Sequence, residues 1–156
     1  MIARRLQESE SENLMAVKPL TEANGWPRRR TILLVEDEPF VREATCGVLE
    51  NAGFAVLPAE DPREAMQLYE QYKRAIDLVM TDMVLPGGTG QELGRDLRRR
   101  SPEVVVLVTS GYTDPEYDTE APESKTYFLA KPYSGRSLVE KIEKILGATQ
   151  AGRAAG

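Results

Sequence analysis

Four short apolar runs, each stopped abruptly by polar or charged residues, most constrain what this chain can fold into. The runs are Thr31–Val35, Asp77–Asp82, Val104–Val108 and Thr126–Ala130. Glu36 and Asp37 follow the first run, Asp82 ends the second, Thr109 follows the third and Lys131 follows the fourth. A short apolar run bounded by acids, Pro or Gly is typical of a buried strand. The strand ends therefore carry the residue types of a reactive site.

Segments with helical spacing of their apolar residues separate these strands. A further short strand is predicted at Phe54–Leu57. Helices are predicted to end at Gly53, to begin at Asp61-Pro62, to end before Ser101 and to end at Gly147. Strands that alternate with helices favour a doubly wound α/β fold around a five-stranded parallel sheet. A chain of 156 residues is long enough for one such domain.

The predicted domain spans residues 30–147. Residues 1–29 lack a sustained apolar period, and the polar, charged run Gln7–Asn13 predicts a flexible extension. A short docking segment within it is a second possibility, carried by Leu14, Met15, Val17 and Leu20. Residues 148–156 are predicted to be a flexible tail. Within the domain, Thr113–Lys125 holds two prolines and five acids, which predicts one or two turns of a weak fourth helix.

Composition excludes several classes of function. The chain has no histidine, so it cannot use imidazole metal ligands or a histidine general base. Its one cysteine, Cys46, cannot form an internal disulfide, and we expect a buried thiol in a reducing cytoplasm. No stretch approaches the roughly 20 apolar residues of a membrane span, so no membrane insertion is expected. Residues 31–147 hold 13 Lys/Arg against 21 Asp/Glu, and this net charge of −8 argues against direct nucleic-acid binding.

The strand ends predict one shared site. In a doubly wound sheet, ligands bind beyond the carboxyl ends of the strands at the topological switch point. With strand order 2-1-3-4-5 this point lies between the first and third strands, which brings Glu36 and Asp37 to Asp82. Three such carboxylates need a cation to stay ionised near neutral pH, and Mg²⁺ prefers oxygen ligands. Lys131 and Thr109 add a positive charge and a hydroxyl, a set that suits a phosphoryl group.

Four motifs resemble the receiver domain of two-component response regulators. Ile32–Pro39 (ILLVEDEP) resembles the family's acidic-pair segment, and Asp77–Gly87 (DLVMTDMVLPG) resembles its phosphoacceptor segment. Val108–Tyr112 (VTSGY) matches the hydroxyl-bearing strand, and Phe128–Tyr133 (FLAKPY) matches the lysine-proline turn. All four stand in the family's order and spacing, which is a specific signal where one motif alone is weak. The resemblance implies the flavodoxin-like receiver fold.

The resemblance also implies a phosphoacceptor. Asp82 would accept a phosphoryl group from the phosphohistidine of a partner, which is a sensor histidine kinase or a histidine phosphotransfer protein. Mg²⁺ would be held by Asp37, Asp82 and the main-chain carbonyl of Val84, with Glu36 acting through water. A domain of this kind is not an enzyme, apart from slow self-dephosphorylation at most.

Signal output follows from the same resemblance. Lys131 would pair with one phosphoryl oxygen, and Thr109 would hydrogen-bond another and carry the signal. Phe128 stands where many receivers have a switching tyrosine, so no hydroxyl is present there. The signal would leave through the surface of the fourth helix, fifth strand and fifth helix to a downstream protein target. Val84 and Gly111 flank the approach of a hydrolytic water in receivers, and neither side chain can hydrogen-bond it, which predicts slow self-dephosphorylation.

Several alternatives stay open or are disfavoured. Glu36 replaces the aspartate more usual at the first acidic position of receivers. A phosphohydrolase with an aspartyl-phosphate intermediate commonly has a second acid where Val84 stands, and an FMN-binding protein would need a phosphate loop where Glu36-Asp37-Glu38 stand. The Gly87–Gly90 loop lacks the lysine of a P-loop and is interpreted as a turn. A receiver-like interaction module without phosphorylation remains an alternative. Met1 and the short tail favour a stand-alone regulator over a receiver domain of a larger hybrid kinase.

Overall fold

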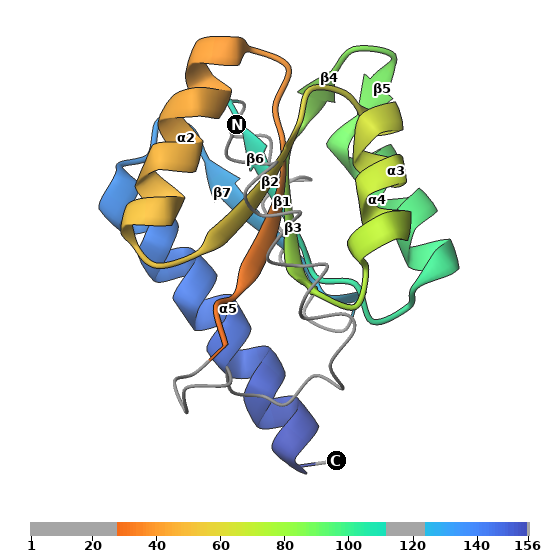
Figure 1. Cartoon of the computed structure of the whole chain (residues 1–156), viewed down its shortest axis with the longest axis vertical. Helices are drawn as coiled ribbons and strands as arrows, with labels where there is room; N and C mark the ends of the chain where they lie inside the picture. Colours follow the sequence, from red (N-terminus) through yellow and green to blue (C-terminus); the bar gives the residue numbers. More distant parts are fainter. Residues whose placement is uncertain (1–27, 112–123, 156) are drawn as a thin grey trace.

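The computed structural model describes residues 28–111 and 124–155, with side chains described as far as residue 148. Its centre is a five-stranded parallel sheet with the strand order β2-β1-β3-β6-β7 (Figure 1). The strands are β1 (Thr31–Val35), β2 (Ala55–Ala59), β3 (Ile76–Asp82), β6 (Val106–Ser110) and β7 (Thr126–Ala130). In chain order this arrangement is 2-1-3-4-5. The predicted fold class and strand order are therefore confirmed.

Helices cover both faces of the sheet (Figure 1). They are α2 (Pro39–Asn51), α3 (Pro62–Tyr72), α4 (Gly90–Arg100) and α5 (Gly135–Ala155). Helices α2 and α5 pack together on one face, while buried residues of α3 and α4 join a separate apolar cluster on the other. Each face of the sheet thus has its own hydrophobic core, as a doubly wound fold requires.

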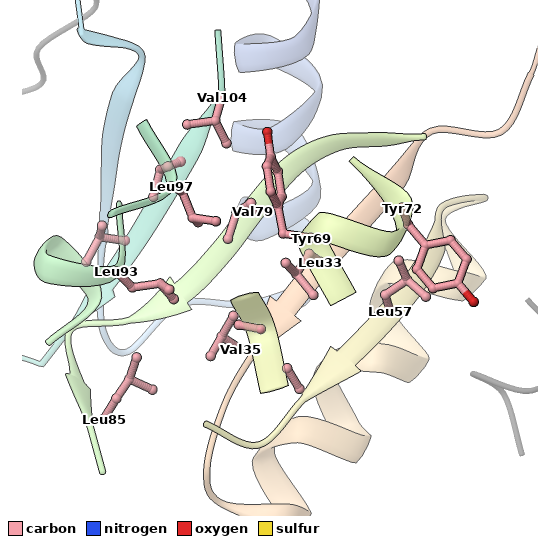
Figure 2. Packing of buried hydrophobic residues seen from close by; sticks show 14 of the residues in the cluster. Leu33, Val35, Leu57, Tyr69, Tyr72, Val79, Leu85, Leu93, Leu97 and Val104 are labelled. Carbon is pink, nitrogen blue, oxygen red and sulfur yellow. The ribbon is translucent and has the colours of Figure 1, made fainter. Parts of the chain in front are cut away.

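Strand β1 shows how the sequence divides between the two cores. Leu33 and Val35 belong to the core beneath α3 and α4, where Figure 2 shows them beside Val79. Ile32 and Leu34 belong to the core beneath α2 and α5. All four side chains are at most 2% exposed. A strand that is apolar on both faces is expected when both faces are covered, because successive side chains point to opposite sides.

Two helices begin at the capping residues that the sequence supplies. The Asp61 side chain accepts a hydrogen bond of 2.8 Å from the main-chain N–H of Glu64 at the start of α3. Thr89 does the same for Glu92 at the start of α4, at 3.1 Å. Such caps satisfy main-chain donors that have no partner within the helix. The prediction that a helix begins at Asp61-Pro62 is confirmed.

The last helix is longer than predicted. We expected it to end at Gly147, but α5 continues to Ala155. Glycine terminates a helix chiefly by adopting positive φ, and Gly147 does not do so, whereas Gly53 has φ of 97° just after α2. The residues that follow Gly147 include Ala148 and Gln150, which are good helix formers and outweigh the penalty of one glycine. The main chain of residues 148–155 is therefore helical.

Two strands lie further along the chain than predicted. The second strand is Ala55–Ala59 rather than Phe54–Leu57, and the fourth is Val106–Ser110 rather than Val104–Val108. Apolar content alone placed the strands, but main-chain pairing decides where each strand ends. Thr109 and Ser110 pair with β7 even though they are polar.

The Gly87–Gly90 loop also contains more structure than the predicted turn. Two short strands, β4 (Val84–Leu85) and β5 (Gly88–Thr89), pair antiparallel across it. Gly87 lies at the bend with φ of 80°, a conformation that favours glycine. A hairpin of this length carries too few apolar residues to be visible as a period in the sequence.

Helix α2 buries only part of the face that its apolar spacing predicts. Of the residues at helical spacing, Leu49 is buried and Val48 is partly buried, but Val41 and Ala44 are exposed. Thr45 and Cys46 are buried beside Leu49. The burial of Cys46 was predicted and is confirmed, with 5% of its surface exposed. Thr45 tolerates burial because its hydroxyl donates a hydrogen bond of 2.7 Å to the carbonyl of Val41.

Some predictions lie outside the described residues. They are nearly all of the flexible extension predicted at residues 1–29, of which only Arg28 and Arg29 are described, and nearly all of the weak fourth helix, of which only Ser124 and Lys125 are described. Over the part of the chain that is described, no helix combines the length and apolar character needed to cross a bilayer.

Candidate functional site

Three acidic side chains meet at the carboxyl end of the sheet. Glu36 and Asp37 follow β1, and Asp82 ends β3, the neighbouring strand. One carboxylate oxygen from each of the three lies within 4.8 Å of the others. The main chain of Glu36 is held in place, because its N–H donates a hydrogen bond of 3.0 Å to the carbonyl of Ala59 at the end of β2. The predicted convergence of Glu36, Asp37 and Asp82 is present.

Lys131 supplies a positive charge directly to this cluster. Its Nζ donates a hydrogen bond of 2.8 Å to Oδ2 of Asp82, although 49 residues separate the two in sequence. The main chain of Lys131 is held as well, since its N–H donates to the carbonyl of Ser110 at 2.7 Å. Strand β7 therefore delivers the lysine to the acidic strand ends by continuing its pairing with β6 for one residue beyond the sheet.

Thr109 lies beside Asp82 on the next strand. The two residues are partners in the parallel register of β3 and β6, and the N–H of Met83 donates to the carbonyl of Thr109 at 2.8 Å. Thr109 is 3% exposed. Together with Glu36, Asp82 and Lys131 it lines one small cavity. The hydroxyl predicted from the sequence thus belongs to the same site.

Burial and the neighbouring charges act on the pKa values of both Glu36 and Lys131, and both values are raised. Burial, followed by the charge of Asp82 and a hydrogen bond with it, raises the pKa of Glu36 from 4.5 to about 7, while Lys131 opposes this change. Burial by itself would lower the pKa of Lys131. The hydrogen bond and charge of Asp82, with a further contribution from Glu36, outweigh burial and raise it. One lysine does not neutralise three neighbouring carboxylates.

The donor set fits a divalent cation. Three carboxylates whose oxygens lie within 4.8 Å form a hard oxygen environment, which suits Mg²⁺. The raised pKa of Glu36 is consistent with such a site, because burial and then the charge of Asp82 disfavour its ionised form, and a bound cation would favour that form. The acidic cluster predicted from the sequence is therefore present as a candidate metal site.

Two other predicted residues lie near the site without touching the acidic cluster through a hydrogen bond. Val84 is in β4, two residues after Asp82, with 64% of its side chain exposed. Phe128 is in β7, paired in register with Val108, and it packs partly buried against the core beneath α3 and α4.

Sequence reasoning missed the importance of Gly90. This buried glycine is the first residue of α4, and its N–H donates to the carbonyl of Met83 at 2.8 Å. A Cβ at this position would overlap the main-chain oxygen of Asp82 and press on the methyl group of Thr81 at 3.0 Å. Gly90 therefore lets α4 approach the main chain of the central aspartate. The glycine-rich loop Gly87–Gly90 was visible in the sequence, but the close contact with Asp82 that requires glycine at position 90 was not.

Arg42, Thr45 and Tyr133 were also missed. The Arg42 guanidinium donates to the carbonyls of Glu36 and Asp37, at 2.8 and 3.3 Å, and so holds the loop that carries both acids. Thr45 and Tyr133 line the same cavity as Lys131. Burial raises the pKa of Tyr133, while Lys131 and the Thr45 hydroxyl oppose this rise. These three residues were missed because they support or surround the site residues and do not belong to the pattern of acids, hydroxyl and lysine at the strand ends.

Comparison with known proteins gives the same picture. Residues 32–143 match the response regulator receiver domain family. The sensor kinase CckA of Brucella abortus is 32% identical over 130 residues, which cover 83% of this chain and 14% of the kinase. The phosphate regulon transcriptional regulatory protein PhoB of Escherichia coli is 35% identical over 121 residues, which cover 75% of this chain and 52% of PhoB. The chain thus spans about half or less of the length of these relatives.

Solved structures extend the comparison to three dimensions. The receiver domain of the hybrid histidine kinase CckA is 32% identical, with a TM-score of 0.63 over 74% of this chain and 98% of that one. The response regulator TrrA of Thermotoga maritima, solved in complex with Mg²⁺ and BeF, is 26% identical, with a TM-score of 0.65 over 74% of this chain and 98% of that one. A receiver domain protein of Clostridium thermocellum shares the fold, with a TM-score of 0.72 over 78% and 98% of the two chains, at 24% identity. With strand order, acidic cluster, lysine and hydroxyl in agreement, the chain belongs to the response regulator receiver domain family.

Proposed function

We propose that this receiver domain takes up a phosphoryl group on Asp82 and passes the resulting change to a downstream protein. The observation that carries the proposal is the hydrogen bond of 2.8 Å between Lys131 and Asp82 within a cluster of three carboxylates. Asp82 is the one of the three that touches the lysine. A carboxylate with a cation beside it and a buried hydroxyl on the next strand is placed to serve as a phosphoryl acceptor.

The transfer step is a displacement at phosphorus. A carboxylate oxygen of Asp82 forms the new P–O bond, the P–N bond of the partner's phosphohistidine breaks, and the released imidazole takes up a proton. Negative charge spreads over the phosphoryl oxygens in such a reaction. Lys131 offsets this charge, and the Thr109 hydroxyl donates to one of the oxygens.

The acidic cluster holds Mg²⁺ in this proposal. Asp37, Asp82 and the carbonyl of Val84 are the ligands, with Glu36 acting through water. When bound, Mg²⁺ supplies positive charge that favours the phosphoryl group next to three carboxylates. The Mg²⁺ named with the related TrrA structure and the charge of the cluster support this assignment.

A phosphohistidine-bearing protein is the donor that best fits the surface around the site. Among the described residues, the exposed large hydrophobic side chains are Phe40, Val41 and Val84, exposed by 81%, 40% and 64%. Phe40 and Val41 lie in the first turn of α2, three and four residues after Asp37, and Val84 follows Asp82 by two residues. Exposed apolar side chains close in sequence to the acidic residues would suit contact with a donor protein. A sensor histidine kinase or a histidine phosphotransfer protein would use this surface, and the cytoplasm is the compartment we assign to the exchange.

The signal leaves the site through β6 and β7. Phosphorylation would draw Thr109 toward Asp82, and Phe128 on the paired strand would fill the space that opens. The proposed output to a downstream protein is the surface formed by β7, α5 and the helix that the sequence predicts at Thr113–Lys125, which is a different helix from α4. A free-energy difference of a few kcal/mol between two states is enough for such a switch.

Phosphoryl uptake is tested by mass. The intact chain is incubated with acetyl phosphate and Mg²⁺, and mass spectrometry measures the gain of one phosphoryl group. Asp82→Asn should abolish the gain, while Asp96→Asn, a matched change of an exposed acid on α4, should leave it intact. Chelation of Mg²⁺ should suppress uptake in the unaltered chain. Equal uptake by Asp82→Asn would refute the acceptor assignment, and no uptake by any form would favour an interaction module that works without phosphorylation.

We also propose that the domain is a phosphoacceptor rather than an enzyme, with slow loss of its phosphoryl group. Hydrolysis requires a water held in line with phosphorus. Val84 and Gly111, both exposed at the rim of the site, have no side-chain group that can hold it. The double variant Val84→Asn/Gly111→Glu should lose phosphate faster than the parent, as measured by phosphate release. A parent chain that decays at the same rate or faster would contradict this.

A further inference from the structure

A groove of about 380 Å³ lies at the end of the domain opposite to the acidic site. Arg28, Arg29 and Arg30 line it as they lead into β1, and Glu143 adds one negative charge from α5. Phe54 and Leu146, both almost fully buried, provide an apolar floor. In Figure 1 the amino end of β1 lies beside the middle of α5. The groove therefore combines an apolar floor with a basic rim.

The three arginines of the rim differ in the contacts that their guanidinium groups make. The guanidinium of Arg28 contacts both carboxylate oxygens of Asp77, at 2.9 and 3.1 Å, and is thus part of the fold. The side chains of Arg29 and Arg30 have no hydrogen bond or ion pair with any residue that the structure describes, whereas the main-chain carbonyl of Arg30 accepts a hydrogen bond of 2.8 Å from the N–H of Ala55. Two cations without partners above an apolar floor stand out in a domain whose residues 31–147 carry a net charge of −8. The groove thus has the charge and the apolar surface that would suit an anionic segment with apolar residues.

We propose that the acidic segment Gln7–Asn13 of this same chain docks onto Arg29 and Arg30 in this groove. Three of its seven residues, Glu8, Glu10 and Glu12, are acidic, and the segment carries no basic residue. Apolar residues follow it at once, at Leu14, Met15 and Val17, and these suit the floor. The segment has both features that the groove favours.

The connection between segment and groove is long enough. Residues 14–27 join Asn13 to Arg28, which itself lines the groove. At about 3.3 Å per residue such a connection spans up to roughly 45 Å. A tether of this kind gives the segment an effective concentration on the order of millimolar at the groove, so that weak ion pairs suffice to hold it. A separate acidic protein would need a much higher affinity to compete.

The test places a spin label beside the acids. A nitroxide is attached to Ser11→Cys in the full chain, and nuclear magnetic resonance records the loss of amide signals close to it. Cys46 will not interfere, since it is 5% exposed and burial raises the pKa of its thiol to about 11. At about 0.01 M salt, where charges act over roughly 30 Å, the amide signals of Gly53, Phe54 and Gly147 should lose most of their intensity. At about 1 M salt, where the range is roughly 3 Å, they should recover.

Two variants show whether charge directs the docking. Arg29→Ser/Arg30→Ser should restore the signals, and so should Glu8→Gln/Glu10→Gln/Glu12→Gln, which leaves the folded domain unaltered. Arg63→Ser/Arg95→Ser is the matched control, because it removes two exposed arginines from α3 and α4 and should not restore them.

Three outcomes would overturn the proposal. They are intact signals at low salt, signal loss that persists in the Arg29→Ser/Arg30→Ser variant, and signal loss that grows with protein concentration. The last result would mean that a second copy of the chain supplies the segment.

Discussion

The two ends of the sheet gather opposite charges in different ways. At the carboxyl end, Glu36, Asp82 and Lys131 are held by strands that stop beside one another, with Lys131 and Asp82 in direct contact. At the amino end, Arg29 and Arg30 line the rim of a groove, and their guanidinium groups have no partner among the described residues. The first arrangement is fixed before any ligand arrives, whereas the second depends on what binds. Rigid placement suits chemistry on one small group, and a loose basic rim suits contact with a chain segment.

The first prediction tests how strictly the carboxyl end is built. Gly90→Ala should lower the free energy of unfolding by about 3 kcal/mol, because its Cβ would force the main chain of Asp82 to move. The displaced aspartate should also take up phosphate poorly from acetyl phosphate. Urea unfolding and mass spectrometry measure the two effects.

Gly94→Ala is the control in the same helix. Its Cβ would meet only Val106, at ordinary distances of 3.6 and 3.8 Å. It should leave phosphate uptake intact and leave stability unchanged or slightly higher, since alanine is the better helix former. Equal effects of the two substitutions would mean that Gly90 has no special relation to Asp82.

The second prediction concerns pH at the crowded acidic end. The pKa of Glu36 is raised from 4.5 to about 7, so the folded chain holds this proton more tightly than the unfolded chain. The contribution of Glu36 to stability is therefore fully present below pH 4.5 and is lost as the pH rises through about 7. The loss amounts to at most about 3 kcal/mol. Urea unfolding in metal-free buffer between about pH 5.5 and pH 8 measures it.

Glu36→Gln should remove this pH dependence while keeping the shape of the side chain. Arg29→Ser, at the opposite end, should retain it. A parent chain whose stability rises over the same interval would show that burial and the charge of Asp82 do not raise the pKa of Glu36 in the folded chain.

The third prediction examines the one engaged arginine at the amino end. Asp77→Ala should cost about 2 kcal/mol of stability, because it leaves the Arg28 guanidinium and the buried N–H of Thr31 without their carboxylate. Asp96→Ala is the control, since its ion pair with Arg99 is 3.6 Å long and well exposed. That change should cost less than about 1 kcal/mol. Similar losses in both variants would show that the Arg28–Asp77 pair is no more than a surface contact.

The fourth prediction has the smallest effect on the fold. Phe40→Ser should change stability by less than about 0.5 kcal/mol, since the ring is 81% exposed. It should slow phosphoryl transfer from a histidine kinase that phosphorylates the unaltered chain, while uptake from acetyl phosphate stays the same. Arg29→Ser should affect neither reaction. Slower uptake from both donors in Phe40→Ser would place the ring in the chemistry rather than in the contact with the donor.

The sequence by itself determined the fold class and the meeting of the main site residues. Apolar runs with two-sided burial required a covered parallel sheet, and the residues just after those runs had to lie at its carboxyl edge. Glu36, Asp82, Thr109 and Lys131 could be named for that reason. These residues come together because of the order of the strands in the sheet, and that order was predicted from the alternation of strands and helices along the whole domain.

Only the tertiary structure decided the features that depend on contacts between distant segments. The overlap of a Gly90 side chain with Asp82, the burial of Thr45 in place of Val41, and the continuation of α5 past Gly147 are not visible in local periodicity. The groove at the amino end is of the same kind, because Arg29, Phe54 and Leu146 come from three separate elements. Periodicity reports which face of a segment is apolar. What that face meets, and how closely, is set by the packing of the whole domain.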